Sequence, residues 1–132
     1  MLYAQLEGRE TIQANRQRRW ERYDCELRDW AAHHNVRLPI IPAECEQPYH
    51  MFYVLLPTLE MRQALINHLK SRGILAVFHY QPLNRSAMGA QYGGDCPVTE
   101  RIADQLLRLP LYNDFTEDEQ SQVLDALDDF AD

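Results

Sequence analysis

The side chains best suited to chemistry follow the apolar run Ile74–Phe78, where His79, Tyr80 and Gln81 precede Pro82. An imidazole, a phenol and an amide can hold a small polar molecule through hydrogen bonds. The run predicts a buried strand that ends at Pro82, since proline lacks the amide needed to continue a ladder. Exposed strand ends often carry small-molecule sites. The alternative is that the two aromatic residues only finish a strand, as half-buried aromatic side chains commonly do.

Metal and thiol chemistry receive less support from the sequence. Cys25, Cys45 and Cys96 are far apart, with no Cys-x-x-Cys pair and no histidine at ligand spacing, so we expect free thiols in a reducing compartment and no metal site. Lys70 is the only lysine, and it stands near the predicted end of a helix, where a cation interacts favourably with the helix dipole. We expect it to be a surface side chain.

The charge of the chain argues against a nucleic-acid partner. Thirteen basic and twenty acidic side chains give a net charge of −7, which repels a phosphate backbone. The arginines around Trp20 alternate with acidic residues and are typical of a solvated helix face. No apolar run approaches the roughly 20 residues of a membrane span, and the first residues lack the basic and apolar regions of a secretion signal. We expect a cytoplasmic protein without a membrane partner.

A long helix is expected over residues 2–34, because this stretch lacks proline and contains only one glycine, Gly8. Its second half has a regular apolar spacing, whereas its first half has few apolar residues and is expected to need a partner outside this chain. The apolar positions are Leu2, Leu6, Ile12, Trp20, Tyr23, Leu27 and Trp30. Residues 35–47, with Pro39 and Pro42, predict an extended connection.

The middle of the chain predicts two strands around a helix. The β-prone run His50–Leu56 predicts a central strand. Thr58 predicts the N-cap of a helix that ends at Gly73, ahead of the strand that carries His79. Residues 84–94 contain three glycines and no sustained period, which predicts a functional or mobile loop.

The last third predicts a helix, an edge strand and a final helix. Pro97 predicts the start of a helix that continues through Leu107, and Arg108–Tyr112 predicts an edge strand because a proline interrupts it. The residues Thr116–Glu119 form a capping-box pattern, and the helix that follows is expected to reach Phe130. The fold class is therefore α+β, a two-layer sandwich of a small, mostly antiparallel sheet with helices.

Four segments, in order and with matching spacing, resemble the closing part of the DegT-type sugar-nucleotide aminotransferases. They are His50–Tyr53, Ala64–Lys70, Ala76–Leu83 and Leu106–Tyr112. Within that family the resemblance is to transaminases that convert dTDP-4-keto-6-deoxyglucose to dTDP-4-amino-4,6-dideoxygalactose, an amino sugar of the lipopolysaccharide type. It covers essentially the whole chain.

The resemblance implies a pyridoxal-phosphate-dependent enzyme of fold type I, which moves an amino group from glutamate to the keto carbon of a nucleotide-linked sugar. Residues 1–34 would form the interdomain helix and residues 35–132 the small C-terminal domain. A large N-terminal domain would carry the Schiff-base lysine and bind pyridoxal phosphate, and the family enzyme would be a homodimer. We accordingly expect no cofactor on this chain and no activity from it alone.

The resemblance assigns substrate binding to His79, Tyr80, Gln81 and Asn84, and no catalytic residue to this chain. Asn84 stands where many relatives have the histidine of a Pro-Leu-His motif. Asparagine can hydrogen-bond a sugar or phosphate, but it cannot move a proton at neutral pH. Two alternatives stay open: a stand-alone binding or regulatory module without chemistry, and the same domain of a pyridoxal-phosphate-dependent ketosugar dehydratase.

Overall fold

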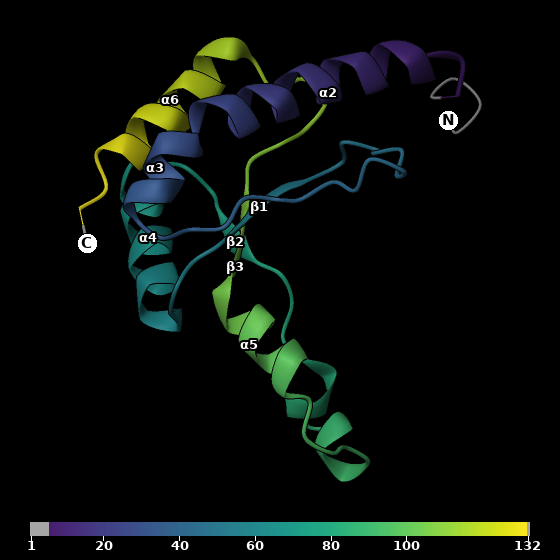
Figure 1. Cartoon of the computed structure of the whole chain (residues 1–132), viewed down its shortest axis with the longest axis vertical. Coiled ribbons are helices and arrows are strands. Elements are labelled where there is room, and N and C mark those ends of the chain that lie inside the picture. Colours follow the sequence, from purple (N-terminus) through teal and green to yellow (C-terminus); the bar gives the residue numbers. More distant parts are fainter. Residues whose placement is uncertain (1–5, 132) are drawn as a thin grey trace.

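A computed structural model describes residues 6–131. It combines helices with a three-stranded antiparallel sheet, which confirms the α+β prediction. In Figure 1, α2, α3, α4 and α6 gather at one end around the sheet, and α5 points away from them with the short turns that precede it. The elements are α2 (Arg9–Glu26), α3 (Arg28–His33), β1 (Phe52–Leu55), α4 (Leu59–Ser71), β2 (Val77–Phe78), η1 (Leu83–Arg85), η2 (Gly89–Gln91), α5 (Pro97–Gln105), β3 (Leu106–Leu109) and α6 (Glu117–Asp128).

The strand order is β1-β3-β2, so the predicted central and edge strands are exchanged. β3 pairs with β1 from Phe52 opposite Leu109 to Leu55 opposite Leu106, and also pairs with β2. The edge prediction for β3 was wrong because Pro110 follows the last paired residue and so removes no bond from the ladder. The helix prediction through Leu107 was also wrong: α5 ends at Gln105, and β3 begins at the next residue.

The strand that leads to His79 is shorter and more exposed than predicted. Only Val77 and Phe78 pair, and both lie on the open edge of the sheet with a neighbour on one side. Leu75 is 78% exposed, whereas Ala76 is buried. The apolar run therefore does not form a buried strand. With β3 as its only strand neighbour among the described residues, β2 leaves Val77 40% and Phe78 51% exposed.

The long helix has two slight interruptions within the described residues. α2 begins after Gly8, and Leu27 separates it from α3. The Leu27 amide still donates to Tyr23, and the Leu27 carbonyl accepts from Ala31, so the helical direction continues across the break. Leu6 is 60% exposed. The predicted apolar position Leu2 lies outside the described residues.

The core joins the second half of α2 to the sheet and to α6. The rings of Trp20 and Tyr23 lie 5.3 and 5.1 Å from the Phe52 ring, and the Tyr23 hydroxyl donates to the Pro110 carbonyl oxygen at 3.1 Å. Other fully buried side chains are Leu27, Val54, Leu56, Leu65, Leu69, Leu107, Gln120 and Leu127. Burial of these apolar surfaces is the main stabilising contribution.

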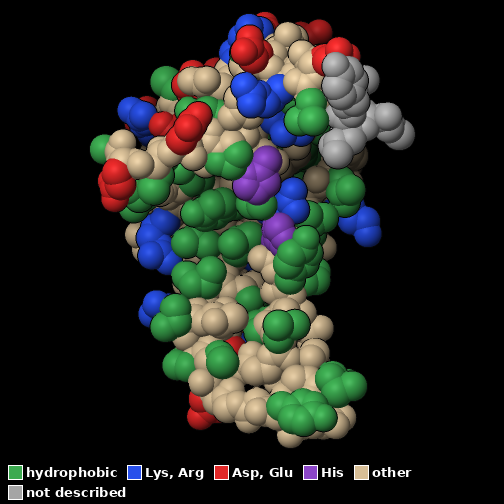
Figure 2. Space-filling view, turned by 90° about the vertical axis from the view of Figure 1, so that its right-hand side faces the viewer, with side chains coloured by type: hydrophobic (Ala, Val, Ile, Leu, Met, Phe, Trp, Pro, Cys, Tyr) green, Lys and Arg blue, Asp and Glu red, His purple; other side chains and the backbone are tan. Residues whose placement is uncertain are grey.

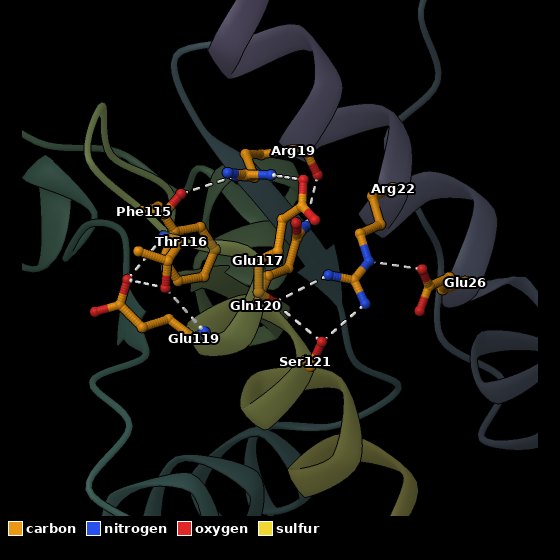
Figure 3. A network of polar contacts seen from close by, with 9 residues as sticks. All are labelled: Arg19, Arg22, Glu26, Phe115, Thr116, Glu117, Glu119, Gln120 and Ser121. Carbon is orange, nitrogen blue, oxygen red and sulfur yellow. Dashed lines mark hydrogen bonds and ion pairs between the residues drawn. The ribbon is translucent and has the colours of Figure 1, made fainter.

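A polar network fastens α2 to the start of α6 (Figure 3). The Arg19 Nε donates to the Phe115 carbonyl oxygen at 2.8 Å, and the buried Gln120 amide donates to the Arg19 carbonyl oxygen at 2.7 Å. Arg22 donates to the Glu117 carbonyl oxygen and to the Ser121 hydroxyl. These bonds join segments almost a hundred residues apart, so they fix the orientation of the helix on the sheet.

Three local predictions are confirmed. Thr58 caps α4 through a bond from the Met61 amide, and Gly73 follows that helix with a φ of 76°. Thr116 and Glu119 form the reciprocal capping box of α6. Among the helices of residues 6–131, none is both long enough and apolar enough to cross a membrane.

Candidate functional site

A hollow of about 410 Å³ lies between the segment after β2 and the first turns of α5. The segment contributes His79, Tyr80, Gln81, Pro82 and Leu83, and α5 contributes Val98, Thr99, Ile102 and Ala103. Three of the four predicted binding residues therefore line one hollow. Their role in binding stays a prediction.

The local structure explains why the chain opens at this point. β2 stops pairing after Phe78, and η1 begins after Pro82, so His79–Gln81 leaves the regular pleat between the two. Pro97 occupies the first position of α5, where its missing amide removes no helical hydrogen bond. The first turn of α5 then brings apolar side chains to the far wall of the hollow.

His79 is the imidazole at the hollow, and its surroundings favour the neutral ring. Partial burial, the Arg108 guanidinium and His50 together hold the pKa of His79 below its ordinary value. The Arg108 guanidinium lies 3.2 Å from His79 Nδ1. A neutral imidazole offers one donor and one acceptor, so this site has hydrogen-bonding capacity without a positive charge of its own.

The other two predicted binding residues at the hollow, Tyr80 and Gln81, differ in whether their side chains are already hydrogen-bonded. Tyr80 is 73% exposed, and its hydroxyl makes no hydrogen bond to a described residue. The Gln81 amide donates to the Arg85 carbonyl oxygen at 3.2 Å, which ties its side chain to η1. Tyr80 is thus the more available of the two for a ligand.

Asn84 points into a separate polar cluster and does not line the hollow. Its amide donates to Glu100 Oε1 at 2.5 Å. Arg85 pairs with the same carboxylate at 2.9 Å and with Asp104 at 3.0 Å. The bonds from Asn84, from Arg85 and from the Cys96 amide hold the pKa of Glu100 below its ordinary value. This cluster binds η1 to α5, and the substrate role of Asn84 stays a prediction.

The predicted loop of residues 84–94 is folded tightly on itself. It forms η2 and packs against η1, as seen at the lower end of Figure 1. A Cβ added at Gly89 would lie 1.7 Å from the Leu83 carbonyl oxygen, so only glycine allows this approach. The loop together with α5 forms an arm that projects from the sheet.

Hydrophobic side chains gather on the face shown in Figure 2, across its middle and down the projecting arm. Charged side chains are concentrated at the opposite end, around the helices. Exposed apolar residues of the arm and of the segment that leads into it are Tyr80, Leu83, Met88, Tyr92 and Val98. An apolar wall of this kind suits the carbon face of a ligand better than an ionic group.

Val98 and Thr99 are lining residues that the sequence reasoning missed. The sequence offered one weak signal, since Val98 and Ile102 stand four residues apart on one face of the predicted helix. That spacing also fits an ordinary core stripe. Their place at the hollow depends on the antiparallel pairing of β2 with β3, which brings the end of β2 beside the end of α5, so that the segment after β2 runs back along α5.

Comparisons with known proteins cover nearly the whole chain. The model of the DegT/DnrJ/EryC1/StrS aminotransferase family matches residues 1–128. The chain is 29% identical, over 70% of its length and 26% of the relative's, to a protein of Geobacillus stearothermophilus named "Pleiotropic regulatory protein". It is also 29% identical, over 81% of its length and 29% of the relative's, to the dTDP-3-amino-3,4,6-trideoxy-alpha-D-glucose transaminase of Micromonospora megalomicea subsp. nigra.

Among solved structures, DesV of S. venezuelae, in complex with a ketimine intermediate, superposes with a TM-score of 0.87 at 25% identity. That match covers 99% of this chain and 36% of DesV. The chain thus spans about a quarter to a third of these relatives. Because the family model matches all but the last four residues, the chain belongs to the DegT/DnrJ/EryC1/StrS aminotransferase family.

Proposed function

We propose that this chain is the C-terminal part of a pyridoxal-phosphate-dependent aminotransferase that moves an amino group from glutamate to a nucleotide-linked 4-keto-6-deoxy sugar. Residues 1–34 act as the interdomain helix and residues 35–132 as the small domain. A large N-terminal domain completes the enzyme, which is a homodimer. The name of the Micromonospora relative, a transaminase of a dTDP-linked deoxy sugar, supports this substrate class.

The observation that carries the proposal is the composition of the hollow. Its walls combine apolar side chains from Leu83, Val98 and Ile102 with the neutral hydrogen-bonding groups of His79 and Tyr80. A deoxy sugar has the matching surface, with a methyl group and ring carbons on one side and hydroxyl or carbonyl oxygens on the other. The walls of this hollow carry no lysine or arginine, so they suit the neutral sugar unit better than its diphosphate.

Two nearby arginines, Arg85 and Arg62, are engaged elsewhere. The Arg85 guanidinium pairs with Glu100 and Asp104, and Arg62 is buried, where its Nη1 donates to the Ala103 carbonyl oxygen at 2.6 Å. We infer that side chains outside residues 6–131 neutralise the phosphate groups. This division matches an enzyme in which the small domain meets the sugar and the large domain meets the charged groups.

The residues present do not fit pyridoxal phosphate. The cofactor requires a lysine amine to form its Schiff base. Lys70 is the only lysine of the chain, and it lies exposed on α4 and away from the hollow after β2. Among the residues that line the hollow there is therefore no Schiff-base lysine, and on this proposal the large domain supplies it. On this proposal the chain has no transaminase activity by itself.

One observation favours a second candidate, a binding or regulatory module without chemistry. The relative from Geobacillus stearothermophilus bears the name of a regulatory protein. In that case the same hollow would bind a nucleotide sugar, and no amino transfer would follow. A ketosugar dehydratase differs from a transaminase at the Schiff-base residue, which this chain does not include.

The test compares the two half-reactions of the complete protein. Tyr80→Phe removes a hydroxyl available at the hollow, and we expect a several-fold lower specificity constant for the ketosugar, since a neutral hydrogen bond contributes about 1 kcal/mol. The glutamate half-reaction should be unchanged. Tyr112→Phe, distant from the hollow along the chain and bonded to Glu119, is the matched control. An unchanged ketosugar half-reaction in Tyr80→Phe would remove the site assignment, and absence of amino transfer would favour the regulatory module.

A further inference from the structure

Arg108 does not line the hollow, but it contacts His79, which does. It lies in the middle of β3, directly opposite Val77 of β2. Residues that face each other across a ladder project to the same face, so Val77 and Arg108 share one face of the sheet. His79 follows the last paired residue of β2, and there Arg108 Nη1 lies 3.2 Å from His79 Nδ1.

This contact determines which nitrogen of the ring carries the proton. A guanidinium has donors only and stays protonated, so the nitrogen that faces it must accept. With Nδ1 as the acceptor, the proton of the neutral ring lies on Nε2. Nε2 makes no hydrogen bond to any residue in the described part of the chain, which leaves it available as a donor.

The other charged groups around His79 act in the same direction. Arg108 and, to a smaller extent, His50 ahead of β1 lower the pKa of the ring, after the larger effect of partial burial. No ion pair joins His79 to a carboxylate within residues 6–131.

We propose that Arg108 is a positioning residue of the site, which holds His79 as the neutral Nε2–H tautomer and so presents one uncharged donor to the hollow. The partner of this donor would be a carbonyl or hydroxyl oxygen of a neutral sugar unit, and this identity rests on the proposed function. An uncharged donor selects such an oxygen without attracting free anions. The positioning itself concerns only this chain's residues.

An NMR titration of the 132-residue chain tests the pair without cofactor or substrate. The imidazole ¹⁵N shifts, assigned with His79→Asn, report both the tautomer and the titration midpoint. In the unmodified chain we expect Nε2–H at pH 7 and a midpoint below 6.5. Arg108→Gln should raise the midpoint and mix the two tautomers, and Arg108→Lys, which restores the cation and donor, should reverse much of both changes. Backbone amide shifts of Leu107 and Leu109 verify that β3 still pairs.

The unmodified chain alone can overturn the proposal: a proton on Nδ1 or a charged ring at pH 7 would exclude it, whether or not the variants fold. A midpoint and tautomer unchanged in a folded Arg108→Gln would exclude it equally. In the complete aminotransferase, Arg108→Gln should move the acid limb of the ketosugar pH profile to higher pH and leave the glutamate half-reaction unchanged. If the titration behaves as expected and this profile does not move, the sugar assignment fails and the positioning stands.

Discussion

Removal of one buried hydroxyl, in Tyr23→Phe, should lower the free energy of unfolding at pH 7 by about 1 kcal/mol. The Tyr23 side chain is fully buried, and its hydroxyl donates a 3.1 Å hydrogen bond to the Pro110 carbonyl oxygen. Phenylalanine preserves the ring and its packing on Phe52, so the substitution isolates the bond, which contributes about 0.5–1.5 kcal/mol. Tyr112→Phe removes a half-exposed hydroxyl and should lower stability less, because water can replace the lost contact.

Alkaline pH should reduce the difference in the free energy of unfolding between the unmodified chain and Tyr23→Phe. Burial raises the pKa of Tyr23 above the ordinary tyrosine value of 10.0, and the smaller effect of Arg22 lowers it. Above pH 10 the unfolded chain releases this proton while the folded protein retains it. The contribution of Tyr23 is thus fully present below pH 10 and falls by about 1.4 kcal/mol per pH unit above it. Tyr23→Phe lacks this loss, so the two stabilities should meet between about pH 10.5 and 11.

Urea unfolding followed by tryptophan fluorescence measures both effects, since Trp20 and Trp30 are buried. The unmodified chain, Tyr23→Phe and Tyr112→Phe should be compared from pH 7 to 11. A difference between the first two that stays constant with pH would show that the hydroxyl titrates normally in the folded protein. Equal losses from the two substitutions at pH 7 would refute the argument that burial makes the Tyr23 bond the more valuable one.

Three further predictions concern the core, a helix end and the arm. Phe52 is fully buried, so Phe52→Ala should lower the free energy of unfolding by about 3–5 kcal/mol. Phe78 is half-exposed, so Phe78→Ala should lower it by under about 1 kcal/mol. Similar losses for the two variants in urea unfolding would contradict the observed burial. Gly73→Ala should lower the free energy of unfolding by about 1 kcal/mol, because alanine is strained at a φ of 76°. A Cβ at Gly94 would likewise meet no atom within 4 Å, and Gly94→Ala should lower stability less. Equal shifts in melting temperature would exclude backbone strain at Gly73 as the cause. The pKa of Glu100 is depressed, so its bonds are fully present above the ordinary value of 4.5 and are lost as pH falls through the lower folded value. The protection of the arm's amides, measured as the exchange rate relative to that of an unstructured chain at the same pH, should therefore fall at acid pH, and Glu100→Gln should remove that dependence.

Features that depend on neighbouring residues, such as helix caps, could be predicted from the sequence. The order of the strands, which depends on pairing between distant segments, could not. Caps at Thr58 and Thr116 and the left-handed turn at Gly73 follow from side-chain and backbone preferences of a few residues, and all three are confirmed. The order of the strands follows from contacts across some fifty residues. A proline within an apolar run predicts an edge strand, but the effect of Pro110 depends on where the pairing ends, and no local pattern predicts that point.

The same limit applies to the site. His79, Tyr80 and Gln81 could be selected because polar groups follow an apolar run, and the family resemblance directed attention to them. The resemblance assigns substrate binding to Asn84 as well, but in the structure its amide donates to Glu100 and the residue does not line the hollow. The wall formed by α5 required knowledge of the sheet register, because β3 follows α5 directly and pairs with β2.

β3 links the hollow to the long helix through two nearby residues. Arg108 contacts His79 at the hollow, and two residues later the Pro110 carbonyl oxygen accepts the hydroxyl of Tyr23 on α2. A central strand is held by hydrogen bonds on both sides, so it resists displacement more than an edge strand does. The orientation of α2 and the position of His79 are therefore both fixed by contacts with β3 and the residue that follows it, and β3 is the central strand of the sheet. This arrangement keeps the hollow in a fixed place relative to α2.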